Sequence, residues 1–174
     1  MMIGTLDMTH NIQEWYEMGA FLAKRRKKFY AAGGTLDIIH SYDNLPILGD
    51  IPDTDDPIAI KGYESIKAAL GVLSAPEDLK LFVAYVDGNL VGAANVLYEE
   101  DNNTIWHMGT LRTVPGIGSS MVLHIAEKAK ERGVGIGSLG TSEPSRWFWD
   151  HITDGDEFAS KEHVYHGILG SQSI

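Results

Sequence analysis

The stretch that decides the fold reads TIWHMGTLRTVPGIGSSMVLHIAEKAKERG and covers residues 104–133. Its first part, Thr104–Val114, is rich in β-branched and aromatic residues and predicts a long strand. The segment Pro115–Gly118 interrupts that strand with one proline and two glycines. Ser119–Arg132 then carries apolar residues at helical spacing and charged residues between them, and Gly133 is typical of a helix C-cap. This unit is therefore predicted to be a strand, a tight glycine loop and an amphipathic helix.

The glycine loop is a candidate anion site. A helix N-terminus leaves backbone N–H groups unpaired and carries partial positive charge, and glycines allow a ligand to approach the backbone. Such a helix start binds phosphate groups, although a plain strand-to-helix turn explains the loop equally well when it is taken alone. A P-loop would need Lys followed by Ser or Thr after the second glycine, and a Rossmann loop would need a glycine where Met121 stands.

Strands are predicted on both sides of this unit. Lys80–Val86 and Leu90–Tyr98, joined by the tight turn Asp87-Gly88-Asn89, form an antiparallel meander with Thr104–Val114. Val134–Leu139 follows the helix and is predicted to pair in parallel with the strand before it, because a helical crossover joins the two. A short helix is predicted to end near Ile152, and His163–Leu169 is predicted to be a final strand.

Residues 1–78 are less regular. Met2–Leu6 predicts a short strand, and Ile12–Ala31 predicts a helix capped by Asn11. The cationic run Lys24–Lys28 is interpreted as a solvated helix end, because cations there complement the helix dipole; an anionic docking patch is the alternative.

Between that helix and the meander, Thr35–Tyr42 predicts another strand and Tyr63–Leu73 a short helix. The loop Asn44–Pro57 contains several aspartates but lacks the calcium-loop pattern, so it is interpreted as a solvated turn.

Composition narrows the class of protein. The 174 residues suit one domain, 1–174, with a hydrophobic core, and the absence of cysteine excludes disulfides and thiolate metal sites. A formal net charge of −10 makes nucleic acid an unlikely partner. No run approaches the roughly 20 apolar residues that span a membrane, and no signal peptide is recognised, so we expect a cytoplasmic protein. No metal is predicted, because His163 and His166 would point to opposite faces of a strand.

The order of elements from about residue 79 to 152 resembles the GNAT family of N-acetyltransferases. The resemblance implies an α/β fold of the α+β type, with a mixed sheet in which an antiparallel meander precedes a β-α-β crossover and helices flank the sheet. In that family the loop binds the pyrophosphate of acetyl-CoA and the preceding strand binds its pantetheine arm. The cofactor residues implied here are Leu111, Arg112, Thr113, Gly116, Ile117, Gly118, Ser119, Ser120, Ser142 and Trp149.

The sequence departs from the family pattern at two places. The position that usually holds Arg or Gln before the glycines is Thr113, with Arg112 one residue earlier. The tyrosine that often acts as an acid on the short helix is replaced by Trp149, which cannot donate a proton at neutral pH. Tyr165 is the substitute acid that we predict, and His107 on the long strand is the predicted base, because its ordinary pKa suits proton transfer near neutrality.

The function implied is transfer of an acetyl group from acetyl-CoA to a primary amine of a small molecule or protein. Residues 1–78 would then shape the acceptor side, and a homodimer stays open as an assembly. An alternative is a catalytically degenerate GNAT-fold module that binds CoA or a protein partner, motivated by Thr113 and Trp149. A third hypothesis, acylation of nucleic acid or charged tRNA, is opposed by the net charge.

Overall fold

The computed structural model describes residues 2–50, 53–72, 75–139 and 158–173, with side chains from residue 12 onward. Six strands form one sheet in the order β1-β2-β3-β4-β5-β6. Neighbouring strands are antiparallel except β4 and β5, which are parallel, so the predicted mixed α/β architecture is confirmed. The strands are β1 (Gly34–Ile39), β2 (Leu79–Val86), β3 (Asn89–Tyr98), β4 (Asn102–Thr110), β5 (Gly135–Ser138) and β6 (Phe158–Ala159).

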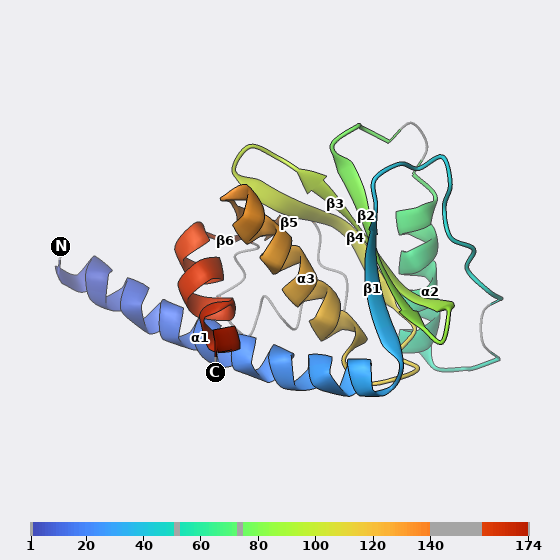
Figure 1. Ribbon diagram of the computed structural model, residues 1–174, viewed down its shortest axis with the longest axis horizontal. Coiled ribbons are helices and arrows are strands. Elements are labelled where there is room, and N and C mark those ends of the chain that lie inside the picture. The colour runs from blue at the N-terminus through green and yellow to red at the C-terminus, as the bar shows by residue number, and fades with distance from the viewer. Residues whose placement is uncertain (1, 51–52, 73–74, 140–157, 174) are drawn as a thin grey trace.

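Helices cover both faces of the sheet (Figure 1). The long helix α1 (Met2–Ala31), the helix α3 (Ile117–Arg132) and the C-terminal segments η1 (His163–Ile168) and η2 (Gly170–Ser173) lie on one face. Of the described helices, α2 (Pro57–Leu70) is the one that covers the other face. None of the described helices is long and apolar enough to cross a bilayer.

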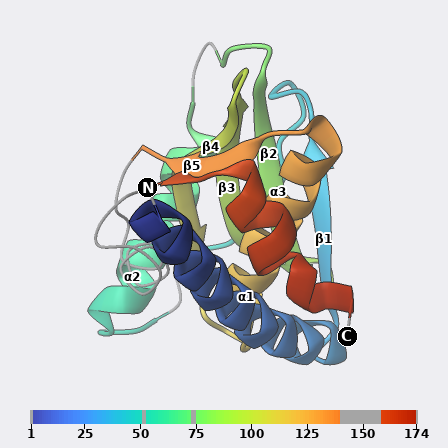
Figure 2. The same ribbon diagram turned by 90° about the vertical axis from the view of Figure 1, so that its left-hand side faces the viewer.

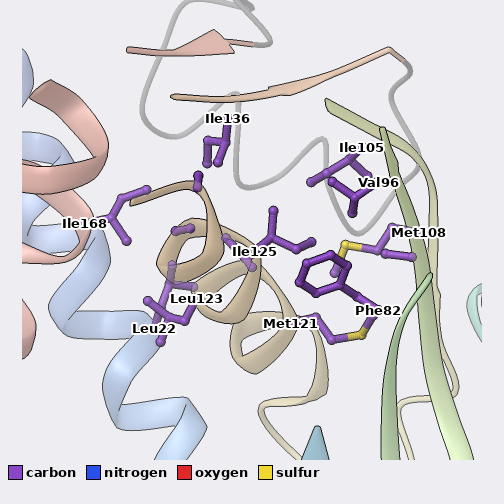
Figure 3. Close-up of a cluster of buried hydrophobic side chains, with 14 of the residues drawn as sticks. Leu22, Phe82, Val96, Ile105, Met108, Met121, Leu123, Ile125, Ile136 and Ile168 are labelled. Atoms are coloured by element: carbon purple, nitrogen blue, oxygen red, sulfur yellow. The ribbon is translucent and has the colours of Figure 1, made fainter. Parts of the chain in front are cut away.

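Two apolar clusters hold these layers together. Along β2, Phe82 packs under α3 while Leu81 and Val83 pack under α2, because successive side chains of a strand point to opposite faces. The larger cluster joins α1, the sheet, α3 and η1, and Figure 3 shows Leu22, Phe82, Ile125 and Ile168 converging on it from these elements. Apolar burial on both faces makes β2, β3 and β4 the rigid centre of the molecule.

The N-terminal region corrects two predictions. Met2–Leu6 is not a strand, and Asn11 does not cap the start of a helix. Both positions lie within α1, which runs unbroken from Met2 to Ala31. Adding residues to an existing helix costs little free energy. A short strand would instead need a neighbouring strand to pair with, and in the described sheet β1 is an edge strand that pairs with β2 alone. The helix stops where predicted, and Gly33 follows it with a φ of 89°.

The C-terminal region corrects another prediction. The predicted strand His163–Leu169 is helical instead, with a wide π-type turn at His163–Ile168. Its buried residues Val164, Gly167 and Ile168 are spaced three and four apart, which is the period of a helix face. The argument that His163 and His166 point apart therefore fails, although no cluster of three metal-binding side chains occurs among the described residues.

Three element boundaries differ from the predictions in ways that affect the site. β4 ends at Thr110 rather than Val114, and α3 begins at Ile117. α2 begins at Pro57, six residues before the prediction, because the carboxylate of Asp56 accepts a hydrogen bond from the N–H of Ile58 at 3.0 Å and caps it. Because β4 ends earlier than predicted, the linker between β4 and α3 is longer than the loop expected from the sequence.

Candidate functional site

β4 and β5 diverge part-way along their length. They pair from Asn102 to Ile105, and the N–H of Leu139 donates to the carbonyl of Ile105 at 2.9 Å. Beyond that point β4 continues to Thr110 with no strand beside it on that edge, within the described part of the chain.

The backbone of β4 turns alternate groups toward this open edge. The N–H of Leu111 donates to Val91 on β3 at 2.8 Å, so the N–H and C=O groups of Met108 and Thr110 point away from β3. An extended ligand can pair with such an edge in the way an added strand does.

The linker after β4 brings α3 up to α1. Gly116 has a φ of 85°, and a Cβ there would lie 2.0 Å from the carbonyl oxygen of Arg25, so only glycine allows α1 to approach this closely. The N–H of Ser120 makes the first bond of α3, to the carbonyl of Gly116 at 2.9 Å. The N–H groups of residues 117–119 therefore have no partner inside the helix.

A cavity of about 510 Å³ opens between α1, the end of β4 and the start of α3. Among the described residues that line it, the charged ones are Arg25 and Arg112, and both are cationic. Together with the positive end of α3, they concentrate positive charge in one hollow of a chain whose net charge is −10. The lining residues are Phe21, Leu22, Arg25, Met108, Thr110, Arg112–Ser119 and Val122.

Most of the predicted loop residues line this cavity: Arg112, Thr113, Gly116, Ile117, Gly118 and Ser119. Ser120 lies behind them, fully buried, and its hydroxyl donates to the carbonyl of Gly116 at 2.6 Å. Leu111 points to the other face of the sheet and packs with the cluster under α2. Ser142 and Trp149 lie outside the described residues.

The sequence analysis missed the contribution of α1. Arg25 lines the cavity, while Arg26 pairs with Glu127 at 3.0 Å, so neither is part of a merely solvated helix end. The neighbouring Lys24, Lys27 and Lys28 are exposed, as that interpretation predicts. The cationic run was the sequence signal that pointed to α1. Which of its cations faces the cavity depends on how α1 packs on α3, and the sequence alone does not give that packing.

His107 lies on β4 next to an irregularity in the sheet. The pairing of β3 with β4 shifts between Asn95 and Val96, which leaves Trp106 as an extra residue on β4. As a result Ile105 and Met108 both pack under α3, and His107 belongs to the opposite face, where its side chain is exposed. Its Nδ1 lies 3.3 Å from Oδ1 of Asn95, and its backbone N–H donates to the same oxygen at 2.9 Å.

Two further polar groups near this irregularity are buried and unpaired. The indole N–H of Trp106 and the hydroxyl of Tyr42 have no hydrogen-bond partner of normal geometry in the described structure. Burial raises the pKa of the Tyr42 hydroxyl to about 12, and the nearby amide of Asn95 opposes that rise. Unpaired buried polar groups destabilise a fold, and they are therefore more typical of functional regions than of plain cores.

Tyr165 does not accompany these residues. Its hydroxyl donates to the carbonyl of Val134 at 3.4 Å, just beyond the C-terminus of α3. The cavity lies at the N-terminus of the same helix, which has 16 residues and so spans roughly 24 Å. Burial, with a contribution from Glu162, raises the pKa of this hydroxyl. The structure thus places Tyr165 in the packing of η1 on α3, away from the cavity.

A family model described as an acetyltransferase (GNAT) domain matches residues 59–147, slightly more than half of the chain. The chain belongs to the GNAT acetyltransferase family. The matched region of this GNAT domain runs from α2 through β4 and α3 and contains the whole linker that lines the cavity. Membership supports acetyl transfer as its general chemistry.

Three solved structures are similar to this GNAT domain at low sequence identity and with TM-scores below 0.5. A ribosomal-protein-alanine N-acetyltransferase from Brucella melitensis biovar Abortus 2308 is 17% identical, with 73% of this chain and 95% of that chain covered and a TM-score of 0.46. An aminoglycoside acetyltransferase from an uncultured soil metagenomic sample is 15% identical, with 68% and 84% covered and a TM-score of 0.40. The toxin AtaT, bound to the C-terminus of the antitoxin AtaR, is 15% identical, with 81% and 99% covered and a TM-score of 0.49.

No curated protein sequence matches this GNAT chain. The similarity to the solved structures concerns the fold, and it carries no information on the acceptor of this protein.

Proposed function

We propose that this protein is an N-acetyltransferase that transfers the acetyl group of acetyl-CoA to a primary amine of a small molecule or protein. The observation that carries the proposal is the cationic cavity at the start of α3, beside the unpaired edge of β4. Acetyl-CoA has an anionic phosphate end and an extended arm with amide groups. The first suits two arginines and a helix N-terminus, and the second suits an open strand edge.

The residues present can divide the binding of acetyl-CoA among them. Arg25, Arg112 and the N–H groups at Gly118 and Ser119 would hold phosphate oxygens. The backbone of Met108 and the N–H of Thr110 would pair with the extended arm, whereas the carbonyl of Thr110 contacts Gly62 of α2. When bound, acetyl-CoA supplies an activated acetyl group as a thioester.

In the proposed reaction, His107 accepts a proton from the acceptor ammonium, which leaves a neutral amine. The amine nitrogen then bonds to the acetyl carbon, the bond from that carbon to sulfur breaks, and CoA leaves as a thiolate that takes the second proton released by the nitrogen. Tyr165 has no part in this proposal, because its hydroxyl lies at the far end of α3.

The alternative function is a GNAT-fold module that has lost its chemistry. Its motivation is Thr113, which stands where the family usually has Arg or Gln. The structure weakens that motive, because Arg112 adopts a φ of 58° and lines the cavity next to Thr113. A left-handed backbone at a non-glycine residue needs support from its surroundings, and here it occurs at an exposed arginine at the rim of the cavity.

Calorimetry with acetyl-CoA and with free CoA tests the proposed cofactor site. We expect micromolar binding by the wild type and a loss of at least about a hundredfold in Gly118→Glu, because the new carboxylate repels phosphate. The fold should tolerate the change, since a Cβ at Gly118 meets only the side chains of Met108 and Thr110, at 3.8 and 3.9 Å.

The matched control is Gly49→Glu, which adds the same charge at a site where a Cβ meets nothing within 4 Å. It should bind CoA like the wild type. If the wild type binds neither ligand up to millimolar concentration, the acetyltransferase proposal fails and the binding module becomes the better hypothesis. If binding is present, release of free thiol in the presence of candidate amines identifies the acceptor class.

A further inference from the structure

Asn95 is a fully buried asparagine at the point where the pairing of β3 and β4 shifts. It lies in the layer between β3 and α2, and its side-chain amide donates to the carbonyl of Ala69 on α2 at 3.0 Å. On its other side, its oxygen accepts from the backbone N–H of His107 at 2.9 Å. A buried polar side chain in an apolar layer is expected to be fully paired, and both ends of this amide are.

These two bonds determine which way the amide of Asn95 points. Only Nδ2 can donate to the carbonyl of Ala69, and only Oδ1 can accept from the N–H of His107. A flipped amide would place two donors together and two acceptors together. The oxygen is therefore the atom that faces the imidazole ring of His107.

The orientation of the amide in turn selects the tautomer of His107. Nδ1 of the ring lies 3.3 Å from Oδ1 of Asn95, which is an acceptor. A neutral imidazole carries one proton, so an acceptor facing Nδ1 favours the tautomer with the proton on Nδ1. Nε2 is then left with its lone pair, on a side chain that is exposed.

We propose that Asn95 is a positioning residue that holds His107 in its Nδ1–H tautomer and so presents Nε2 as the base toward the acceptor amine. The inference rests on the proposed function, in which His107 takes that proton. In the step, the N–H bond of the acceptor ammonium breaks and a bond from Nε2 to hydrogen forms, which leaves a neutral amine and an imidazolium. The imidazolium later returns the proton to water.

The irregularity in the sheet makes this arrangement available. In a regular strand without this irregularity, Ile105 and Met108 are three residues apart and would point to opposite faces, so one of them would leave the core under α3. With it, His107 lies on the same face as Asn95, where the two side chains meet. The irregularity therefore keeps the core under α3 intact and still gives His107 a buried partner on the other face.

The test combines nitrogen NMR of the imidazole with steady-state kinetics on the full chain. In the wild type with neutral His107, we expect the nitrogen shifts of an Nδ1–H ring. In Asn95→Leu we expect the Nε2–H tautomer to gain population. We also expect kcat to fall by about tenfold to a hundredfold, part of the contribution of a general base, while KM for acetyl-CoA changes by less than about twofold.

The matched control is Asn103→Leu, which removes another fully buried asparagine, on β4, whose amide donates to the carbonyl of Ile125 rather than holding His107. This variant should keep the Nδ1–H tautomer and the wild-type kcat, even if its fold is less stable.

Three outcomes overturn the inference while leaving acetyl transfer in place. One is the Nε2–H tautomer of His107 in the active wild type, an outcome that can be observed without any variant. Another is an Asn95→Leu protein whose tautomer changes but whose kcat does not. The third is an equal loss of kcat in the Asn103→Leu control. Failure of the wild type to bind CoA would instead overturn the proposed function, and the role of His107 with it.

Discussion

At the scale of single residues, two arginines turn a hollow in an acidic protein into a candidate anion site. Arg112 reaches the cavity because its backbone adopts a left-handed conformation, and Arg25 reaches it because Gly116 lets α1 approach the linker. Phe21 lies under the guanidinium of Arg25, with 5.8 Å between that group and the ring centroid. The aromatic ring restricts where the cation can lie, which favours its use as a ligand-binding group.

We predict that Arg25→Ala weakens CoA binding by about tenfold to a hundredfold, the value of one or two charge-assisted hydrogen bonds. Calorimetry at low salt measures this effect, and added salt should reduce it. Lys24→Ala is the control, because it removes the same charge from the same helix turn but from an exposed side chain that does not line the cavity. Equal losses in both variants would mean that only the general field of α1 matters.

At the scale of elements, α2 lies directly on the backbone of β4. A Cβ at Gly62 would lie 2.1 Å from the carbonyl oxygen of Thr110, and a Cβ at Gly109 would lie 2.5 Å from the carbonyl oxygen of Gly62. These two glycines let the helix and the strand touch without side chains between them. α2 thereby helps to fix the last residues of β4, the part of the strand whose outer edge is unpaired.

We predict that Gly62→Ala destabilises the protein by about 1–3 kcal/mol, because the new methyl group forces α2 away from β4. At an exposed helix position the same change would stabilise by about 1 kcal/mol, so the sign itself is informative. Urea denaturation gives the free energy of unfolding. The comparison variant is Ala68→Gly on the exposed face of α2, which should show the ordinary preference for alanine. A stabilised Gly62→Ala protein would contradict the close approach.

At the scale of the whole molecule, the C-terminal segment packs on α1, the first helix of the chain. Figures 1 and 2 place the red C-terminal segment against α1, and Trp15 of α1 lies 5.6 Å from the ring of His163, measured between centroids. Gly167 faces the same tryptophan, and a Cβ there would lie 2.5 Å from the Cβ of Trp15. This contact ties α1, and with it Arg25, to the rest of the domain.

Two half-buried histidines make the stability of the fold sensitive to pH. Burial lowers the pKa of His163, and it also lowers the pKa of His124 on α3, which packs edge-on against Phe82. The folded protein therefore binds these protons less readily than the unfolded chain, whose histidines have pKa values near 6.5. The resulting stability is fully present above about pH 6.5, and it is lost as the pH falls through the lower pKa values of the folded state.

We predict that the free energy of unfolding falls between pH 7.5 and pH 5, as measured by urea denaturation at each pH. His163→Gln should reduce the slope, since it removes one of the two titrating groups. His166→Gln, at an exposed histidine three residues away, should leave the slope unchanged. A wild type of constant stability over this range would contradict the burial of both rings.

Local patterns in the sequence were enough to predict the elements at the centre of the molecule. The apolar and aromatic run Lys80–Val86, the turn at Gly88 and the helical spacing after Gly118 predicted the meander, the crossover and the loop that lines the cavity. These signals depend only on neighbours in sequence, so they survive without knowledge of the fold. The extra residue at Trp106 leaves no such signal, because it exists only in the pairing of β4 with β3.

Tertiary structure alone decided the rest. It turned His163–Leu169 from a predicted strand into a helix, because Trp15 offers that segment an apolar partner, and the edge of β5 away from β4 is taken by the two residues of β6. It also selected Arg25 from a run of five cations, and it placed Tyr165 away from the cavity. Sequence determined which residues form the glycine loop that we propose as the phosphate site. Packing between elements distant in the chain determined which side chains share the cavity, since that depends on contacts that no local pattern encodes.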